Sequence, residues 1–199
     1  MTNPPFAGEI SEKQILKNYE LAKKKDKVIS RIDRHILFIE RNLNFLKDGG
    51  RMAIVLPQGR FNNTSDKMIR EYISEKARIL AVVGLNVNTF KPHTGTKTSV
   101  LFVQKWNDDP KAGPLCPKRE DYPIFFAVSE KSGKDNSGEY VFLKNGNGST
   151  GLTTGAPKLD KNGHLVINHD LHNHDGELPD GVAEKFIEWA KSEKLSFWK

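Results

Sequence analysis

Apolar residues recur at alternating spacings of three and four along the stretch from residue 29 to residue 46. The positions are Ile29, Ile32, Ile36, Ile39, Leu43 and Leu46. This spacing aligns the side chains on one face of an α-helix, so it predicts a helix of about five turns. The sequence Asp48-Gly49-Gly50 follows, and a glycine at this point suits the left-handed conformation that ends many helices.

Three continuous apolar runs predict strands. The run "RMAIVLP" at 51–57 follows the glycines and does not alternate with polar residues, so it predicts a strand buried on both faces, as in parallel sheets. The runs "RILAVVGL" at 78–85 and "TSVLFVQKW" at 98–106 are joined by a loop without a helix. Strands connected in this way are expected to be antiparallel neighbours. A helix, a turn and a buried strand in succession indicate an α/β fold.

The pattern loosens beyond residue 106. Short strands are predicted at 122–128 and 140–144. Two stretches rich in Gly, Asn and Ser, "SGKDNSGEY" before the second strand and "NGNGSTGLTTG" after it, read as surface turns. Val182, Phe186 and Trp189 share one face of a final amphipathic helix. We therefore expect a main body over residues 1–106 and a loop-rich extension over residues 107–199.

The composition favours an intracellular protein with a polyanionic partner. The net charge is +6 and the isoelectric point about 9.3, which suits nucleic acid without requiring it. The lysine-rich stretch "KNYELAKKKDK" at 17–27 is read either as a solvated surface or as a phosphate-contacting segment. Cys116 is the single cysteine, so no internal disulfide is possible and a reducing cytoplasm is expected. No apolar run has the length of a membrane span, so no membrane association is expected.

The tetrapeptide Asn3-Pro4-Pro5-Phe6 holds the main candidate chemistry. An Asn amide both donates and accepts hydrogen bonds. The prolines have no N–H and restrict the backbone, so the Asn3 side chain and the Pro4 carbonyl are available as outward acceptors beside the Phe6 ring. This combination suits the exocyclic amine of a planar base. The alternative is an ordinary proline-rich turn in a terminal tail.

Three segments in this order resemble a known family. They are "TNPPF" at 2–6, "LNFLKDGGRMAIVLPQGRF" at 43–61 and "FKPHTGTKTSVLFVQK" at 90–105. Together they resemble the N6-adenine DNA methyltransferases, most closely the modification subunit of type I restriction–modification systems. The resemblance implies a partial Rossmann-like methyltransferase fold, made of the later strands and helices and ending in an antiparallel hairpin. Residues 1–106 would be the C-terminal half of the catalytic domain, and residues 107–199 a small extension.

The family mechanism assigns roles to particular residues. By this resemblance Asn3 and the Pro4 carbonyl accept from the amine of a flipped adenine, Pro5 completes the rigid motif and Phe6 stacks on the base. The methyl group would come from S-adenosylmethionine, with no metal. Phe90, in the later motif, is either a second contact to the base or a core residue. Four basic side chains could meet DNA phosphates or be ordinary solvated charges: Arg51, Arg60, Lys91 and Lys97.

The sequence departs from the family at the cofactor. In the family, a glycine-rich turn and an acidic residue that hold S-adenosylmethionine precede the tetrapeptide, and no equivalent motif is found in these 199 residues. We therefore expect the chain to be inactive alone. The flank of the strand around 53–56 would be an unpaired apolar edge, which self-association, the N-terminal segment or a missing half would cover. The family also implies DNA, a specificity subunit and a restriction subunit as partners.

Two other functions are considered. Glutamine-N5 protein methyltransferases also use an Asn-Pro-Pro-aromatic motif, although "TGTKTSVLF" at 94–102 argues against them. A non-catalytic scaffold or DNA-binding remnant is the second. A histidine-rich stretch with two aspartates could bind zinc or be a polar surface loop, and we expect no metal because it lacks a helical His-x-x-x-His pair and cysteines. Its members are His164, His169, Asp170, His172, His174 and Asp175.

Overall fold

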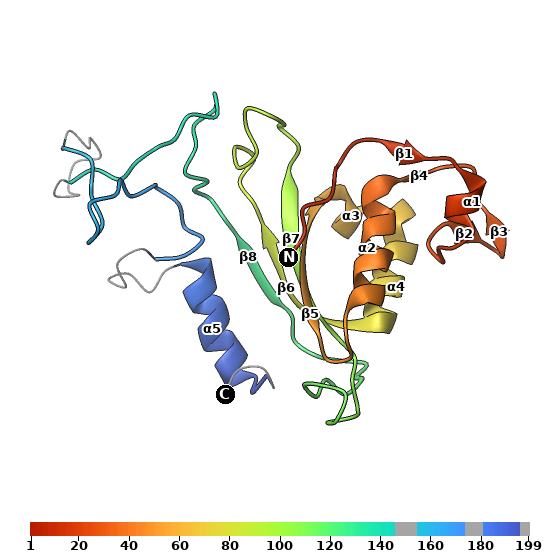
Figure 1. Cartoon of the computed structure of the whole chain (residues 1–199). Helices are drawn as coiled ribbons and strands as arrows, with labels where there is room; N and C mark the ends of the chain where they lie inside the picture. The colour runs from red at the N-terminus through yellow and green to blue at the C-terminus, as the bar shows by residue number, and fades with distance from the viewer. Residues whose placement is uncertain (146–154, 174–180, 196–199) are drawn as a thin grey trace. The chain divides into compact units, whose positions relative to one another are not determined.

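The computed structural model describes residues 1–145, 155–173 and 181–195 (Figure 1). The chain forms two compact units. Unit 1 consists of residues 1–83, 98–126 and 195–199, and unit 2 of residues 84–97 and 127–194. The predicted division at residue 106 does not coincide with these units, because the chain beyond it folds back within unit 1. There, the N–H of Ile79 donates to the hydroxyl of Tyr122 at 3.3 Å.

A four-stranded sheet organises the fold. Its strands are β5 (Arg51–Pro57), β7 (Thr98–Lys105), β6 (Ala77–Gly84) and β8 (Phe125–Val128), in the order β5-β7-β6-β8. The two strands joined by the helix-free loop, β6 and β7, are neighbours as predicted. Strand β5 was expected to favour a parallel sheet, but it pairs antiparallel with β7, with Ile54 opposite Leu101.

Helices cover one face of this sheet in unit 1. Helix α2 (Arg34–Phe45) and helix α4 (Lys67–Lys76) lie on the same side of β5, with the short α3 (Gly59–Asn62) and the 3-10 turn η1 (Thr64–Asp66) between β5 and α4 in the chain (Figure 1). Alternate residues of β5 face these helices. The core unites apolar side chains from α2, β5, α4 and β7: Ile39, Leu43, Ile54, Leu56, Ile69, Ile73, Leu101 and Val103.

Helix α2 is shorter than its apolar pattern predicts. It begins at Arg34 rather than at Ile29, because the residues before it belong to strand β4 (Ile32–Asp33), which pairs antiparallel with β1 (Glu9–Ile10). The backbone of Asp33 is extended, with φ −60° and ψ 136°. Ile32 is nevertheless buried, so the apolar spacing continues across a break in the helix. The helix ends at Phe45 with an extended Leu46, so the predicted glycine cap was wrong; Gly49, with φ +71°, lies in the turn before β5.

The pairing of β1 with β4 closes an excursion of the chain over residues 9–33. It contains helix α1 (Lys13–Leu16) and a hairpin of β2 (Lys23–Lys24) with β3 (Lys27–Val28). Leu16, Leu21 and Ala22 are buried and root the excursion in the core of unit 1. The lysine-rich stretch is therefore an ordered hairpin, not a loose tail.

Unit 2 holds the later part of the extension, from Ala127 to Lys194. Helix α5 (Val182–Ser192) forms where the amphipathic pattern predicts it. Single bridges, such as Phe142 to Ile167 and Leu159 to Leu165, connect the segments before it. Most of the Gly/Asn-rich stretch at 145–155 lies outside the described residues. None of the helices in the described ranges has the length and apolar composition needed to cross a bilayer.

Candidate functional site

The tetrapeptide is placed by the residue that precedes it. Thr2 forms a parallel bridge with Ile54 in β5. Its N–H donates to the Ala53 carbonyl at 2.9 Å, and its own carbonyl accepts from the Val55 N–H at 3.1 Å. A segment parallel to β5 leaves the sheet at the carboxyl end of that strand, which is the end where open α/β sheets bind their ligands.

The four residues of the motif differ in exposure. Pro4 is buried, Phe6 is half-buried, and Asn3 and Pro5 are exposed. A buried proline fixes the turn, while the amide of Asn3 stays accessible and the ring of Phe6 keeps an exposed portion. Of the two predicted acceptors, the Asn3 amide belongs to an exposed residue and the Pro4 carbonyl to a buried one, and the roles of both stay predictions.

A buried histidine lies close to the motif. His35, in the first turn of α2, is 1% exposed, and neither ring nitrogen makes a well-formed hydrogen bond within the described chain. Burial and then the Arg60 guanidinium lower the pKa of His35, against the carboxylates of Asp33 and Asp66 and the nearby backbone of Phe6. The lowered pKa favours the uncharged ring, whose environment includes the backbone of Phe6.

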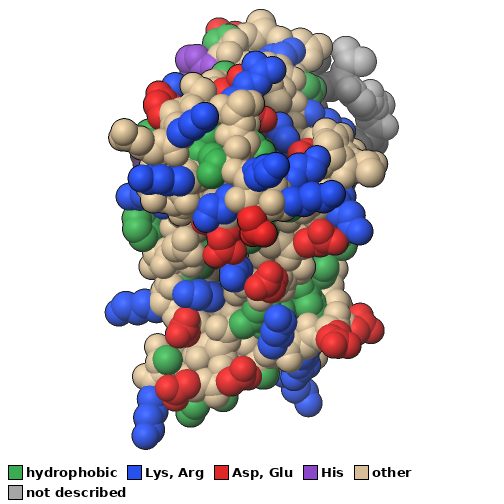
Figure 2. Space-filling model, turned by 90° about the vertical axis from the view of Figure 1, so that its right-hand side faces the viewer, with side chains coloured by type: hydrophobic (Ala, Val, Ile, Leu, Met, Phe, Trp, Pro, Cys, Tyr) green, Lys and Arg blue, Asp and Glu red, His purple; other side chains and the backbone are tan. Residues whose placement is uncertain are grey.

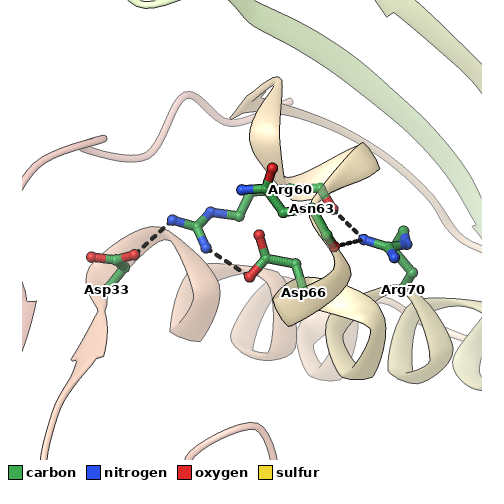
Figure 3. A network of polar contacts seen from close by, with 5 residues as sticks. All are labelled: Asp33, Arg60, Asn63, Asp66 and Arg70. Carbon is green, nitrogen blue, oxygen red and sulfur yellow. Dashed lines mark hydrogen bonds and ion pairs between the residues drawn. The ribbon is translucent and has the colours of Figure 1, made fainter.

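Arg60 joins the start of α2 to η1. Its Nη2 lies 2.7 Å from Asp33 Oδ2 and its Nη1 lies 2.9 Å from Asp66 Oδ1. Figure 3 shows the guanidinium between the two carboxylates, with Arg70 donating to the Asn63 carbonyl beside them at 2.8 Å. The structure thus gives Arg60 two protein partners. Its predicted contact with a DNA phosphate stays a prediction.

Sequence reasoning missed His35 and a second buried polar residue of α2, Glu40. Both lie on the apolar stripe of the helix, His35 three residues after Ile32 and Glu40 three residues before Leu43. The signal that could have found them is a titratable side chain at a core position. Glu40 is 2% exposed, and its carboxylate accepts from the N–H groups of Glu20 and Leu21, both at 2.9 Å.

The other predicted residues divide between the units. Arg51 is exposed on β5 in unit 1, whereas Phe90, Lys91 and Lys97 belong to unit 2. Lys97 is exposed and Phe90 is half-buried.

The loop that carries Phe90 is braced within unit 2. Lys91 Nζ donates to the Asn136 carbonyl at 2.8 Å, and Lys134 Nζ donates to the Lys91 carbonyl at 2.7 Å. The Asn88 amide adds a bond of 3.2 Å to Asn136 Oδ1. The loop that resembles the family's base-side motif is therefore fixed by the extension.

One sign of a nucleotide-cofactor site is a glycine with positive φ between the end of a strand and the start of a helix. The glycines with positive φ are Gly8, Gly49, Gly133, Gly138 and Gly163. None of these stands between the end of a strand and the start of a helix, where a glycine-rich cofactor turn would lie. The acidic and glycine elements of a S-adenosylmethionine site are therefore not assigned to this chain.

The histidine-rich stretch gives no metal centre within the described ranges, where no cluster of three metal-ligating side chains occurs. Asp170 is occupied by Ser129 Oγ at 2.6 Å and by the Glu130 N–H at 2.7 Å. The rings of His169 and His172 stack edge to face at 4.6 Å. His174 and Asp175 lie outside the described residues.

The fold and the motif together define a class. An Asn-Pro-Pro-Phe turn beside β5, on an α/β sheet with the antiparallel β7 inserted next to β5, is the later part of a Rossmann-like methyltransferase fold. Comparison with protein families gives the particular group. The model of the N-6 DNA methylase family matches residues 1–147, and the chain belongs to this family.

Known proteins similar to this chain are much longer. The methylase subunit of the type I restriction enzyme EcoEI from Escherichia coli is 33% identical over 106 residues, which cover 53% of this chain and 20% of that protein. The type II restriction enzyme and methyltransferase RM.Eco57I from Escherichia coli is 28% identical over 109 residues, 54% of this chain and 11% of its own length.

Solved structures show the same pattern. The methyltransferase subunit of a type I restriction-modification system from Streptococcus thermophilus is 28% identical, with a TM-score of 0.43, covering 54% of this chain and 23% of that one. This chain therefore corresponds to a minor share of each relative.

Proposed function

We propose that this chain carries the base-recognition part of a DNA adenine-N6 methyltransferase of a type I restriction–modification system. The observation that supports this most is the Thr2–Ile54 bridge, which sets Asn3-Pro4-Pro5-Phe6 at the carboxyl end of β5 in a chain of the N-6 DNA methylase family. The family membership disfavours the glutamine-N5 alternative.

The residues of the motif act on the base. The adenine leaves the duplex, because its N6 amine cannot be reached inside the stack. Asn3 Oδ1 and the Pro4 carbonyl accept the two N–H groups of the amine, which fixes the nitrogen and turns its lone pair away from the motif. Phe6 stacks on the ring. This chain contributes positioning, which supplies a large share of the rate in reactions of this kind.

The methyl donor of the family is S-adenosylmethionine, which supplies the methyl group when bound. Because the sequence has no glycine-rich cofactor turn of the family's kind, we assign cofactor binding to residues of the longer relatives that lie outside the part matched by this chain. A missing N-terminal half, on the same or a complementary polypeptide, would bring them. DNA, a specificity subunit, a restriction subunit and a cytoplasmic location belong to the same proposal.

The test is a comparison of two duplexes that differ at one position. One has an unpaired adenine and the other an abasic site. We expect the chain to prefer adenine, and Asn3→Ala to reduce the preference about fivefold, the equivalent of about 1 kcal/mol for one hydrogen bond. Asn44→Ala is the matched control, since Asn44 is an exposed asparagine on α2.

Equal binding of the two duplexes by the unchanged chain would overturn the proposal and favour a DNA-binding remnant. A preference that Asn3→Ala leaves unchanged would remove the motif from base recognition.

A further inference from the structure

The positive charge of this chain is concentrated in a short segment. Between residues 11 and 31 there are seven basic and three acidic side chains, a net charge of +4 against +6 for the whole chain. About a tenth of the sequence thus carries two thirds of the net charge. All seven basic side chains are exposed: Lys13, Lys17, Lys23, Lys24, Lys25, Lys27 and Arg31.

The hairpin of β2 and β3 presents four of them. Lys24 lies opposite Lys27, and the turn between them is Lys25-Asp26, with φ +48° and +63°. Two non-glycine residues with positive φ in succession form the tight two-residue turn whose twist matches a hairpin. Such backbone is uncommon outside glycine and asparagine, and it tends to persist where the surroundings hold it.

The base of the hairpin is fixed in the core. The buried carboxylate of Glu40 accepts from the N–H groups of Glu20 and Leu21, and the Ile29 N–H donates to the Ala22 carbonyl at 3.0 Å. Leu21 and Ala22 are 1% and 0% exposed. The buried Glu40 carboxylate and one backbone hydrogen bond thus hold the base of the hairpin, which we call the lysine finger because lysines lie at its tip.

The hairpin belongs to an excursion of the chain that follows the Asn-Pro-Pro-Phe motif directly in the sequence. The excursion over residues 9–33 starts three residues after Phe6, and its two ends are joined by β1–β4 and by the Arg34 N–H, which donates to the Gly8 carbonyl at 3.0 Å. Figure 2 views the side of the molecule that carries α1 and the hairpin in Figure 1, and on this face exposed Lys and Arg side chains are mixed with Asp and Glu side chains.

We propose that the hairpin Lys23–Val28 binds the phosphate backbone of the duplex beside the methylated adenine; this rests on the proposed function. Lysine ammonium groups are point charges that bind phosphates without reading bases, so the finger gives affinity and no sequence preference. A protein partner fits less well, because protein interfaces are depleted in lysine and are built around aromatic anchors, which the finger lacks.

The test is the salt dependence of duplex binding by the full chain. One variant replaces Lys23, Lys24, Lys25 and Lys27 by Gln. The control replaces four exposed lysines elsewhere in unit 1 by Gln: Lys47, Lys67, Lys111 and Lys118. Each variant removes the same charge, and its thermal unfolding is compared with that of the unchanged chain.

We expect the slope of log K against log salt to become shallower in the hairpin variant. The decrease should be about 0.9 for each phosphate that a lysine no longer neutralises, or about 2 to 4 in total. The control should change the slope by less than about one. The preference for an unpaired adenine over an abasic site should stay the same in both variants.

The outcomes separate the two proposals. A hairpin variant that keeps the slope of the unchanged chain, or whose slope decreases no more than that of the control, overturns this inference and leaves base recognition standing. A reduced slope in a chain that never prefers adenine overturns base recognition alone. Absence of duplex binding by the unchanged chain at any salt concentration overturns this inference as well.

Discussion

Thr2 is bridged in parallel to Ile54, in the middle of β5. Ile54 is fully buried, so the residue in front of the motif is registered against one of the most deeply buried points of the core. Strand β7 pairs with one edge of β5, and among the described residues Thr2 is the residue that pairs with the other edge. The position of the Asn-Pro-Pro-Phe turn relative to β5 therefore depends on two backbone hydrogen bonds.

Replacing Thr2 by proline should weaken adenine recognition without touching a base-contacting group. Proline has no N–H, so the bond to the Ala53 carbonyl is lost and the turn is no longer held at the end of β5. We expect the preference for unpaired adenine over an abasic site to fall about fivefold, as for one hydrogen bond of about 1 kcal/mol. Thr2→Val keeps the N–H and a β-branched side chain, so it should behave like the unchanged chain. Equal effects of the two substitutions would contradict this role of the bridge.

Removing the Arg60 side chain should destabilise the fold. Asp66 is 5% exposed, and Arg60→Ala would leave its carboxylate buried without its partner at 2.9 Å. We expect the free energy of unfolding in urea to fall by about 2 kcal/mol. Arg31→Ala is the control: its ion pair with Glu9 is 3.4 Å long and exposed, so the loss should stay below about 0.5 kcal/mol. Similar losses for both variants would show that the Asp33–Arg60–Asp66 cluster has no special weight.

Glu40→Gln should loosen the base of the lysine hairpin. A glutamine oxygen can accept one of the two N–H groups, but its NH₂ group then faces the other donor. We expect a loss of about 1 to 3 kcal/mol in unfolding free energy, with faster hydrogen exchange of the Glu20 and Leu21 amides. Glu75→Gln, at an exposed position of α4, should change neither. Unchanged exchange at Leu21 in Glu40→Gln would contradict the anchoring role.

Stability should fall in mild acid because of His35. Its pKa in the folded state lies below 6.5, chiefly through burial, so the unfolded chain binds the proton first. The contribution is fully present above pH 6.5 and is lost as the pH falls from there toward the folded pKa, at up to about 1.4 kcal/mol per pH unit. Urea titrations between pH 5 and 7.5 should show this slope, and His35→Gln should flatten it. His93→Gln, at an exposed site, should not. A slope that survives in His35→Gln would assign the acid sensitivity to other groups.

Much of the fold was predictable because its strands are strong local signals. The apolar runs became β5, β6 and β7 at nearly the expected bounds, and the helix-free loop predicted that β6 and β7 are neighbours. The start of α2 was wrong by five residues. Ile29 and Ile32 continue the apolar spacing, but β4 takes the backbone of Ile32 into a pairing with β1 that spacing does not report.

The candidate site was predictable only where a short motif carries its own chemistry. Residue types made Asn3, Pro4, Pro5 and Phe6 candidates, the family resemblance gave them roles, and these roles stay predictions. The Asp33–Arg60–Asp66 cluster could not be predicted, because Asp33 lies 27 residues before Arg60 and Asp66 lies six residues after it, with no helical spacing between them. Each is also a residue type that is ordinarily found on the surface. His35 and Glu40 stood on an apolar stripe, and that position was the one local sign of their burial. The roles of Phe90, Arg51, Lys91 and Lys97 stay predictions.

The most direct test is a calorimetric titration of the full chain with a duplex that contains one unpaired adenine, run with and without S-adenosylmethionine. If the chain holds the base side of the site and not the cofactor side, it binds one duplex per chain with the same dissociation constant in both runs, and S-adenosylmethionine alone releases no heat. Stoichiometric binding of S-adenosylmethionine by the chain alone, or no binding of the duplex, would contradict the account.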